Sequence, residues 1–268
     1  MRDLKDRATT NKPVLLGERN GGVVTLTLNR PEQFNALSQA LLTELDRALA
    51  EIAEDDTARV VIIAGAGKAF CAGHDLKEMR AHTDLEFQRS LFEQCSRMMI
   101  ALTELPQPVI ARVHGVATAA GCQLVAMCDL AVASENARFA VSGINVGLFC
   151  STPSVALARN IGRKQAMEML LTGDFIDART ALERGLVNRV VPKDQLDAEV
   201  KKLAEAIVAK SPTAVASGKR LFYRQLELGM ADAYDAASDV IACDMMTKDA
   251  QEGIDAFFEK RPPDWRGR

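Results

Sequence analysis

Residues 60–79 read VVIIAGAGKAFCAGHDLKEM, and this stretch decides the class of fold. Its first five residues are apolar and mostly β-branched, which predicts a buried strand. A glycine-containing loop over 65–79 follows, and a helix begins near Leu85. Residues 108–128, PVIARVHGVATAAGCQLVAMC, repeat the scheme as a strand, a loop of small residues and an apolar helix from residue 121. Two such units in succession predict an α/β fold.

The flanking sequence extends this pattern at both ends. Val14–Leu16 and Val23–Leu28 lie on either side of an Asn-Gly-Gly turn, which predicts a hairpin. Apolar residues recur at helical spacing over 38–53, with Ser38 as the expected N-cap. Beyond residue 154 the pattern is mostly helical, so we expect helices to pack on the core or on a neighbouring subunit.

Composition limits the partners of the chain. It has 268 residues, is 48% hydrophobic and carries a formal charge of -3, which gives no bulk electrostatic reason for binding nucleic acid or an anionic membrane. The six cysteines form no Cys-x-x-Cys pair and the three histidines have no metal-ligand spacing, so we expect reduced thiols and no metal site. Residues 1–13 are charged and polar, and no run of 18 apolar residues exists. We therefore expect a cytoplasmic protein that binds neither nucleic acid nor membrane.

The two loops share a physical character, because in each a strand ends in small residues that leave the backbone uncovered. Backbone N–H groups there are free to donate hydrogen bonds. Two donors that converge on one point would stabilise an oxyanion or enolate, an effect of about 3–4 kcal/mol per donor. The alternative is that glycine and alanine in these loops only permit close packing.

Several motifs occur in order along nearly the whole chain. They are Asn29-Arg30-Pro31 with Asn35-Ala36-Leu37, Ala69 to Met79, Gly121-Cys122-Gln123-Leu124, Leu171 to Asp174, Gly185-Leu186-Val187 and Glu252 to Phe257. Together they resemble the enoyl-CoA hydratase/isomerase family, also called the crotonase family, and residues 143–153 resemble its divergent domain-containing-3 type. The resemblance implies a spiral core of repeated ββα units at 13–200, a C-terminal helical trimerisation region at 201–268 and a flexible tail at 1–12. It also implies a homotrimer or a dimer of trimers.

The same resemblance implies an acyl-coenzyme A thioester as ligand, with coenzyme A as part of the substrate and no permanently bound cofactor. The backbone N–H groups of His74 and Ala120 match the two positions of the family's oxyanion hole. Contacts with coenzyme A are implied for a group of loop residues and for two C-terminal residues of a neighbouring subunit: Ala72, Asp75, Leu76 and Lys77, and then Phe257 and Lys260.

The sequence departs from the family at the groups that transfer protons. Family members that hydrate 2-enoyl-CoA use two glutamates, and Gln123 and Gly143 stand at those positions here. A positioned acid or base contributes about 10²–10⁴ in rate, so ordinary hydration is expected to be weak or absent. Replacing both residues by glutamate is expected to raise crotonyl-CoA hydration. Ala119-Ala120 also replaces a common Gly-Gly, at a cost of roughly 1–2 kcal/mol if the site demands a positive φ.

Several functions stay open at this level: an enzyme of the family acting as a lyase, isomerase or hydrolase, a non-catalytic acyl-CoA binding protein and, ranked last, an RNA-binding protein. The side chains of His74, Asp75 and Glu78 are candidate replacement acids or bases, and the Cys150 thiol is a candidate nucleophile for thioester hydrolysis or transfer. Each also has a structural interpretation, since Asp75 is more simply a helix cap and Cys150 a small buried thiol. Basic residues such as Lys219 either contact coenzyme A phosphates or form a solvated face.

Overall fold

The computed structural model describes residues 12–267, so the predicted tail lies, apart from Lys12, outside the described residues. The predicted hairpin is confirmed: β1 (Leu15–Asn20) and β2 (Val23–Leu28) pair antiparallel across a Gly-Gly turn in which both φ angles are positive. The predicted helix is α1 (Gln39–Ala53), and its N-cap Ser38 accepts a hydrogen bond from the Leu41 N–H. Local capping and hairpin signals therefore fix the first elements correctly.

Two sheets hold the core together. The larger has the order β1-β2-β3-β5-β7-β10 and is parallel from β2 onward, and the smaller has the order β4-β6-β8-β9 with β9 antiparallel. The remaining strands are β3 (Val60–Gly65), β4 (Ala69–Cys71), β5 (Val109–Val113), β6 (Val116–Thr118), β7 (Leu130–Ser134), β8 (Arg138–Ala140), β9 (Ile176–Asp177) and β10 (Arg189–Val191).

Three consecutive segments of the chain follow one plan. Each gives one strand to the larger sheet, then one to the smaller sheet, and then forms a helix: β3 and β4 precede α2 (Leu76–Ala81) and α3 (Leu85–Glu104), β5 and β6 precede α4 (Ala120–Met127), and β7 and β8 precede α5 (Ser151–Asn160). Every segment advances one place in both sheets. The α/β class and the spiral of ββα units are thus confirmed.

The prediction of simple loops at 65–79 and 115–120 was wrong. The first stretch contains β4 and most of α2, and the second contains β6. Both strands are three residues long and rich in small side chains, which leaves no hydrophobic alternation to detect. They exist because β4 pairs with β6 and β6 with β8, contacts that only the folded chain supplies.

Helices cover both faces of the larger sheet. Val61 and Ile63 of β3 belong to the main core with α1, α3 and α4, whereas Val60 and Ile62 pack with α8 (Leu196–Val208) on the opposite face. The predicted division between residues 200 and 201 therefore falls inside a helix that packs on the core. The other helices before it are α6 (Arg163–Thr172) and α7 (Ala178–Glu183).

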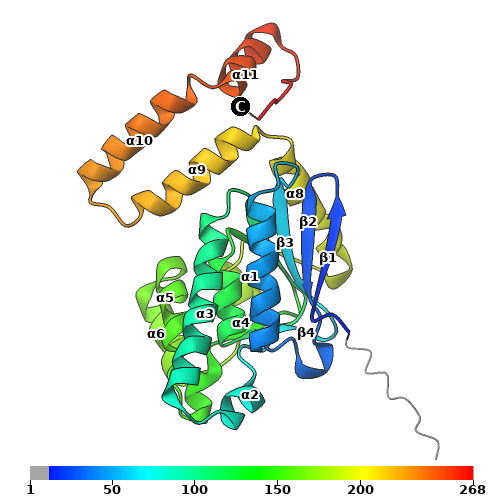
Figure 1. Cartoon of the computed structure of the whole chain (residues 1–268), viewed down its shortest axis with the longest axis vertical. Helices are drawn as coiled ribbons and strands as arrows, with labels where there is room; N and C mark the ends of the chain where they lie inside the picture. Colours follow the sequence, from blue (N-terminus) through cyan, green and yellow to red (C-terminus); the bar gives the residue numbers. More distant parts are fainter. Residues whose placement is uncertain (1–11, 268) are drawn as a thin grey trace, which may run out of the picture.

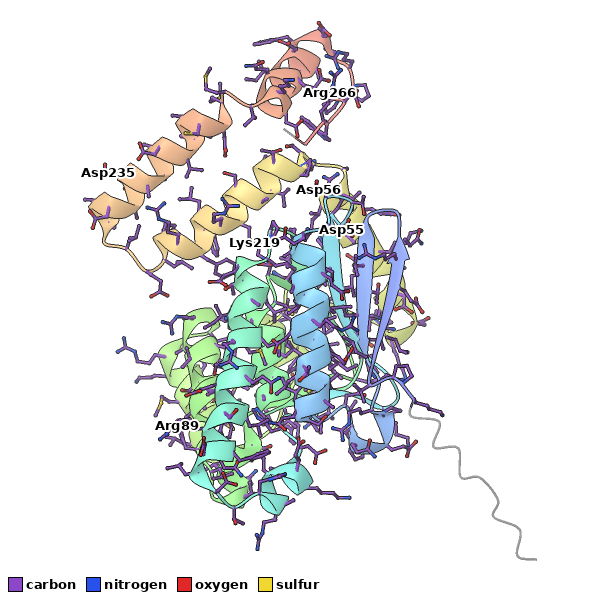
Figure 2. All side chains as sticks on the ribbon, viewed as in Figure 1. Asp55, Asp56, Arg89, Lys219, Asp235 and Arg266 are labelled. Carbon is purple, nitrogen blue, oxygen red and sulfur yellow. The ribbon has the colours of Figure 1, made fainter. Side chains whose placement is uncertain are left out.

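The last three helices form an arm, α9 (Pro212–Gln225), α10 (Met230–Asp244) and α11 (Lys248–Glu259), that extends from one end of the core (Figure 1). Lys219 anchors it where α9 meets the core (Figure 2). Its buried Nζ donates to the carbonyls of Leu102 and Gln107 and, at 2.6 Å, to the Asp129 carboxylate. Neither expected role of Lys219, coenzyme A contact or solvated face, is therefore correct. Along residues 12–267, no helix combines the length and apolarity that a membrane span requires.

Candidate functional site

The backbone around His74 is fixed by a single parallel β-bridge with Leu37. The Leu37 N–H donates to the Gly73 carbonyl at 2.8 Å, and the Leu37 carbonyl accepts from the Asp75 N–H at 3.1 Å. Because successive N–H groups of an extended chain point to opposite sides, the His74 N–H points away from Leu37. Among residues 12–267 it donates no hydrogen bond.

Ala120 presents the second free N–H. It is the first residue of α4, where a helix has no internal acceptor to offer. The N–H groups of Cys122 and Gln123 both donate to the Ala119 carbonyl, whereas the Ala120 N–H finds no acceptor within the described chain. Ala119 holds φ 49° and ψ -123°, so the strain that a positive φ imposes on alanine falls on Ala119 and not on Ala120.

The two loops meet at Gly73. A Cβ placed on this residue would lie 2.8 Å from the Ala119 Cβ and 3.0 Å from the Ala120 nitrogen, and its φ of +88° is itself a glycine conformation. The segment that ends at His74 and the start of α4 therefore touch, with one unpaired N–H on each. Such a pair of donors can bind a carbonyl oxygen and stabilise negative charge on it.

The His74 imidazole is enclosed and neutral. Its ring packs edge-on against Phe92 with the centroids 4.9 Å apart, and its buried Nε2 has no hydrogen-bond partner within residues 12–267. Burial lowers the pKa of His74 from 6.5 to about 4, because the charged form loses its hydration. At neutral pH the ring is a weak base that carries no charge.

Gln123 lies on the same face of α4 as Ala120, three residues further along. Its side chain is 5% exposed, its Oε1 is buried, and its amide makes no hydrogen bond to any described residue. A helical side chain of this kind points back toward the N-terminus of its helix, which is the end that carries the Ala120 N–H. The amide is thus a polar, untitratable group at the edge of the site.

Gly143 stands in a turn that has no room for a side chain. It is the second residue of the short 3-10 helix Ser142–Val146, and a Cβ there would lie 2.6 Å from the Leu148 carbonyl oxygen and 2.8 Å from the Cys150 Sγ. The Gly143 N–H donates to that sulfur at 3.2 Å. Burial raises the pKa of the Cys150 thiol, so the interpretation of Cys150 as a buried, unactivated thiol is the better one.

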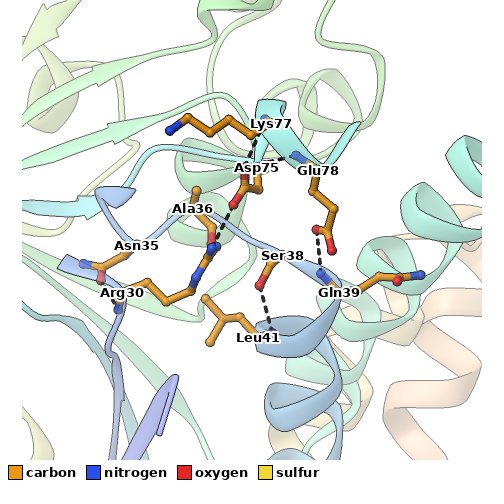
Figure 3. Close-up of polar contacts among 9 residues, drawn as sticks. All are labelled: Arg30, Asn35, Ala36, Ser38, Gln39, Leu41, Asp75, Lys77 and Glu78. Atoms are coloured by element: carbon orange, nitrogen blue, oxygen red, sulfur yellow. Dashed lines mark hydrogen bonds and ion pairs between the residues drawn. The ribbon is translucent and has the colours of Figure 1, made fainter. Parts of the chain in front are cut away.

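Asp75 and Glu78 are both occupied by structural contacts (Figure 3). Asp75 caps α2 by accepting from the N–H groups of Lys77 and Glu78, and it pairs with Arg30 at 2.8 Å. Burial works to raise the pKa of Asp75, but the Arg30 guanidinium and the two N–H groups outweigh it and lower the pKa. Glu78 accepts from the Gln39 N–H at the start of α1. The cap interpretation of Asp75 is confirmed, and neither carboxylate is a free base.

The residues expected to contact coenzyme A divide into two groups. Ala72, Asp75, Leu76 and Lys77 follow directly on β4 and flank His74. Phe257 and Lys260 lie at the end of α11, at the opposite end of the molecule from α2 (Figure 1), and Phe257 is 79% exposed. One chain therefore does not bring the two groups together.

Two residues of the site carried no predicted role. Arg30 donates to the Ala36 carbonyl and to Asp75, and the fully buried Asn35 donates from its amide to carbonyls of residues 66, 69 and 70. In the sequence, Arg30 was recognised only as part of a motif that ends a strand, and Asn35 only as part of a second motif. Asn35 has a φ of +55°, an angle that asparagine tolerates better than most residues. An asparagine shortly after the strand break was therefore the one signal in the sequence for this turn.

Comparison with known proteins identifies a family and several relatives with the same fold. A family model described as Enoyl-CoA hydratase/isomerase matches residues 18–268. The enoyl-CoA hydratase domain-containing protein 3 of Xenopus laevis is 46% identical over 94% of this chain and 86% of its own length, and the human protein of that name is 44% identical over 91% and 80%. The crystal structure of a Mycobacterium smegmatis enoyl-CoA hydratase superposes with a TM-score of 0.94 at 60% identity, covering 95% of this chain and 99% of that one. The human domain-containing protein 3 structure gives 0.92 at 43% identity, covering 94% and 100%.

One expectation is corrected by this comparison. The relatives from frog and human are both named as mitochondrial proteins, which contradicts the predicted cytoplasmic location. That prediction rested on the polar character of residues 1–13, which lie mostly outside the described residues. Composition alone therefore misplaced the protein.

Proposed function

Because the chain belongs to the enoyl-CoA hydratase/isomerase family, we propose that it binds acyl-CoA thioesters and holds the carbonyl oxygen between the N–H groups of His74 and Ala120. The observation that carries this proposal is that both N–H groups are unpaired in the described chain while Gly73 packs against Ala119 and Ala120. Coenzyme A enters as part of the substrate, and no permanent cofactor takes part.

The chemistry of such a site follows from its charge distribution. Two donors on a thioester carbonyl draw electron density toward oxygen and stabilise the enolate or tetrahedral oxyanion that forms when the neighbouring carbon is deprotonated or the carbonyl is attacked. The donors are backbone groups set by a β-bridge and a helix start, so they need little reorganisation during reaction. Carbonyl polarisation is thus the activity that the geometry supports best.

Water addition to a 2-enoyl-CoA needs proton transfer as well. Gln123 has no titratable proton and Gly143 has no side chain, while Asp75 and Glu78 serve as caps. The neutral His74 ring and the protonated Cys150 thiol are poor bases. We expect weak hydration or none, because each missing acid or base is worth about 10²–10⁴ in rate.

The same observations favour a second candidate, an acyl-CoA binding protein without turnover. It requires the two N–H donors and a coenzyme A contact surface but no base. We place the expected coenzyme A contacts at Ala72, Asp75, Leu76 and Lys77, with Phe257 and Lys260 supplied by a neighbouring subunit. The candidates differ only in whether a bound thioester is changed.

A panel of acyl-CoA thioesters tests both candidates. Calorimetry measures binding to saturated, 2-enoyl and 3-enoyl thioesters, and mass spectrometry of the same mixtures measures turnover. Binding with turnover supports the enzyme, and binding without turnover of any thioester supports the carrier. No binding of any member would contradict both.

Adding the first family glutamate alone tests the acid position. We expect Gln123→Glu to raise crotonyl-CoA hydration at least about tenfold, because it places a carboxyl on the face of α4 that carries Ala120. Gln225→Glu on the arm adds the same charge elsewhere and is the matched control. An unchanged rate in a folded Gln123→Glu protein would show that residue 123 does not face the bound acyl group.

Gly143→Glu, the second half of the double replacement, cannot test the position of the acid. A glutamate there would drive its Cβ into the Leu148 carbonyl and the Cys150 sulfur, so the turn would have to rebuild. The expectation that the double replacement restores hydration is therefore revised to the single replacement.

The arm supports a proposed assembly. It carries a series of large apolar side chains that one chain leaves exposed: Phe222, Leu226, Met230, Tyr234, Ile241, Met245, Met246, Phe257 and Phe258. Burying such residues between subunits is favourable, so we propose a homotrimer or a dimer of trimers. Sedimentation equilibrium that gives a monomer at micromolar concentration would contradict this assembly.

A further inference from the structure

The segment Arg30–Ser38, which precedes α1, contacts the chain on both sides of His74, and its Arg30 reaches the Asp75 carboxylate (Figure 3). The Phe34 carbonyl accepts from the Ala72 N–H at 3.0 Å, and Leu37 forms the bridge to His74. Bonds from this segment thus engage the backbone on both sides of His74 and leave the His74 N–H itself free. The segment fixes both the register and the direction of that N–H.

Asn35 holds the near end of the loop. Its Nδ2 donates at 2.8 Å to the carbonyls of Ala66 and Ala69 and at 3.2 Å to that of Phe70, and its Oδ1 accepts from the Arg30 N–H. The Asn35 amide thus supplies a hydrogen-bond donor to all three carbonyls. Gly65 leaves it room, since a Cβ there would lie 2.9 Å from the Asn35 amide nitrogen.

Arg30 holds the far end. Its guanidinium donates to the Ala36 carbonyl at 2.6 Å and to the Asp75 carboxylate at 2.8 Å, so one planar group joins the residue before Leu37 to the residue after His74. Both side chains are largely shielded, at 17% and 14% exposed, which strengthens the pair. Backbone strain at Phe34 and Asn35, with φ of 50° and 55°, is held in place by these bonds.

We propose that Arg30 and Asn35 are positioning residues that aim the His74 N–H at the thioester oxygen, and that Arg30 acts through its simultaneous hold on Ala36 and Asp75. The inference rests on the proposed function. Arg30 acts through Ala36 and Asp75, which flank the Leu37–His74 bridge, and Asn35 acts through the carbonyls of residues 66, 69 and 70 earlier in the same loop. Ala120 is set separately, through the Ala119 N–H bond to the Ala140 carbonyl at 3.0 Å.

A comparison of two ligands isolates the effect of the carbonyl. Butyryl-CoA has a thioester oxygen and S-butyl-CoA, its thioether, has none. The dissociation constant of S-butyl-CoA divided by that of butyryl-CoA therefore reports the oxyanion hole and cancels coenzyme A contacts. We expect Arg30→Met to lower this ratio about tenfold, since small displacements of a positioned group cost up to about 10². Arg30→Lys should recover part of it, because lysine reaches only one of the two acceptors well.

Arg112→Met is the matched control, since Arg112 pairs with Asp197 on α8, away from His74. It should keep the wild-type ratio and lose less thermal stability than Arg30→Met, because the Asp197 side chain is 78% exposed. If Arg30→Met and Arg112→Met give the same ratio as the wild type, the positioning role is wrong. A wild-type ratio near one would instead overturn the proposed oxyanion hole. Should Arg30→Met not fold, Asp75→Asn decides by the same ratio, because it keeps a capping oxygen and weakens the ion pair.

Discussion

The loop that carries His74 and the region around Gln123 and Gly143 differ in how their polar groups are paired. Around His74, the backbone, Asn35 and Arg30 satisfy almost every neighbouring polar group and leave one N–H free. At the other positions, the Gln123 amide is buried without a partner in the described chain, and the Gly143 turn is filled by Leu148 and Cys150. Within residues 12–267 the first region leaves one backbone donor open, whereas the second has no titratable side chain at residue 123 and no room for a side chain at residue 143.

Under the proposed function, this difference makes carbonyl binding and proton transfer structurally separable. Carbonyl binding depends on backbone geometry, which small residues and a β-bridge maintain. Proton transfer depends on side chains, and residue 123 can exchange an amide for a carboxyl of nearly the same shape. Changes to the first region should therefore damage both stability and binding, whereas Gln123→Glu should alter turnover alone.

Gly73→Ala should have the largest effect. The added methyl would overlap the Ala119 Cβ and force alanine to φ +88°, which together lower the free energy of unfolding by about 3 kcal/mol. Acyl-CoA affinity should fall with it, because the two donors would move apart. Urea unfolding and calorimetry measure the two losses.

Gly218→Ala is the control for that change. Gly218 lies inside α9, a Cβ there meets nothing within 4 Å, and its φ is not positive. Alanine should stabilise this helix by about 0.5–1 kcal/mol and leave affinity unchanged. Equal losses in the two variants would show that the contact at Gly73 has no special importance.

The second prediction is a loss of stability in mild acid, caused by the buried imidazole of His74. Its pKa is about 4 in the folded protein against 6.5 as the ordinary value, so between these values the unfolded chain binds more protons. The contribution of His74 is complete above pH 6.5 and is lost as the pH falls toward 4. At about pH 5 the loss should be on the order of 2 kcal/mol.

Urea unfolding at neutral pH and in mild acid measures this loss, with His74→Gln as the reference that lacks the titrating ring. The wild type should lose more stability than His74→Gln over the same pH interval. Identical pH dependence in the two proteins would contradict a buried neutral ring.

Much of the fold could be predicted from local patterns in the sequence. The hairpin, α1 with its Ser38 cap, β3 and the start of α3 all follow from signals within a few residues. The short strands β4 and β6 could not be found, because their stability comes from pairing with each other. Local signals identify the long elements, whereas β4 and β6 are identified only by their pairing in the sheet.

Part of the site could be predicted, but from resemblance to a family and not from local sequence patterns. The positions of His74 and Ala120 came from resemblance to a family, and their unpaired N–H groups became visible only in the fold. The function of Arg30 required knowing that Asp75 lies beside it, 45 residues along the chain, and that of Lys219 required Asp129, 90 residues away. Contacts at such separation leave no local pattern.

Ala119→Gly should have the smallest effect and sharpens the comparison from the side of the second donor. Ala119 holds a positive φ that alanine adopts at a cost of about 1–2 kcal/mol, and glycine adopts it freely but loses more chain entropy on folding. The two terms leave a net gain in stability of about 1 kcal/mol at most, with the carbonyl preference of butyryl-CoA over S-butyl-CoA unchanged. Thermal unfolding measures the change in stability, and the ratio of the dissociation constants of the two ligands measures the carbonyl preference. A clear fall in that preference would mean that the Ala119 methyl, which leaves no room for a Cβ on Gly73, also helps to aim the Ala120 N–H, so the two donors would not be set independently.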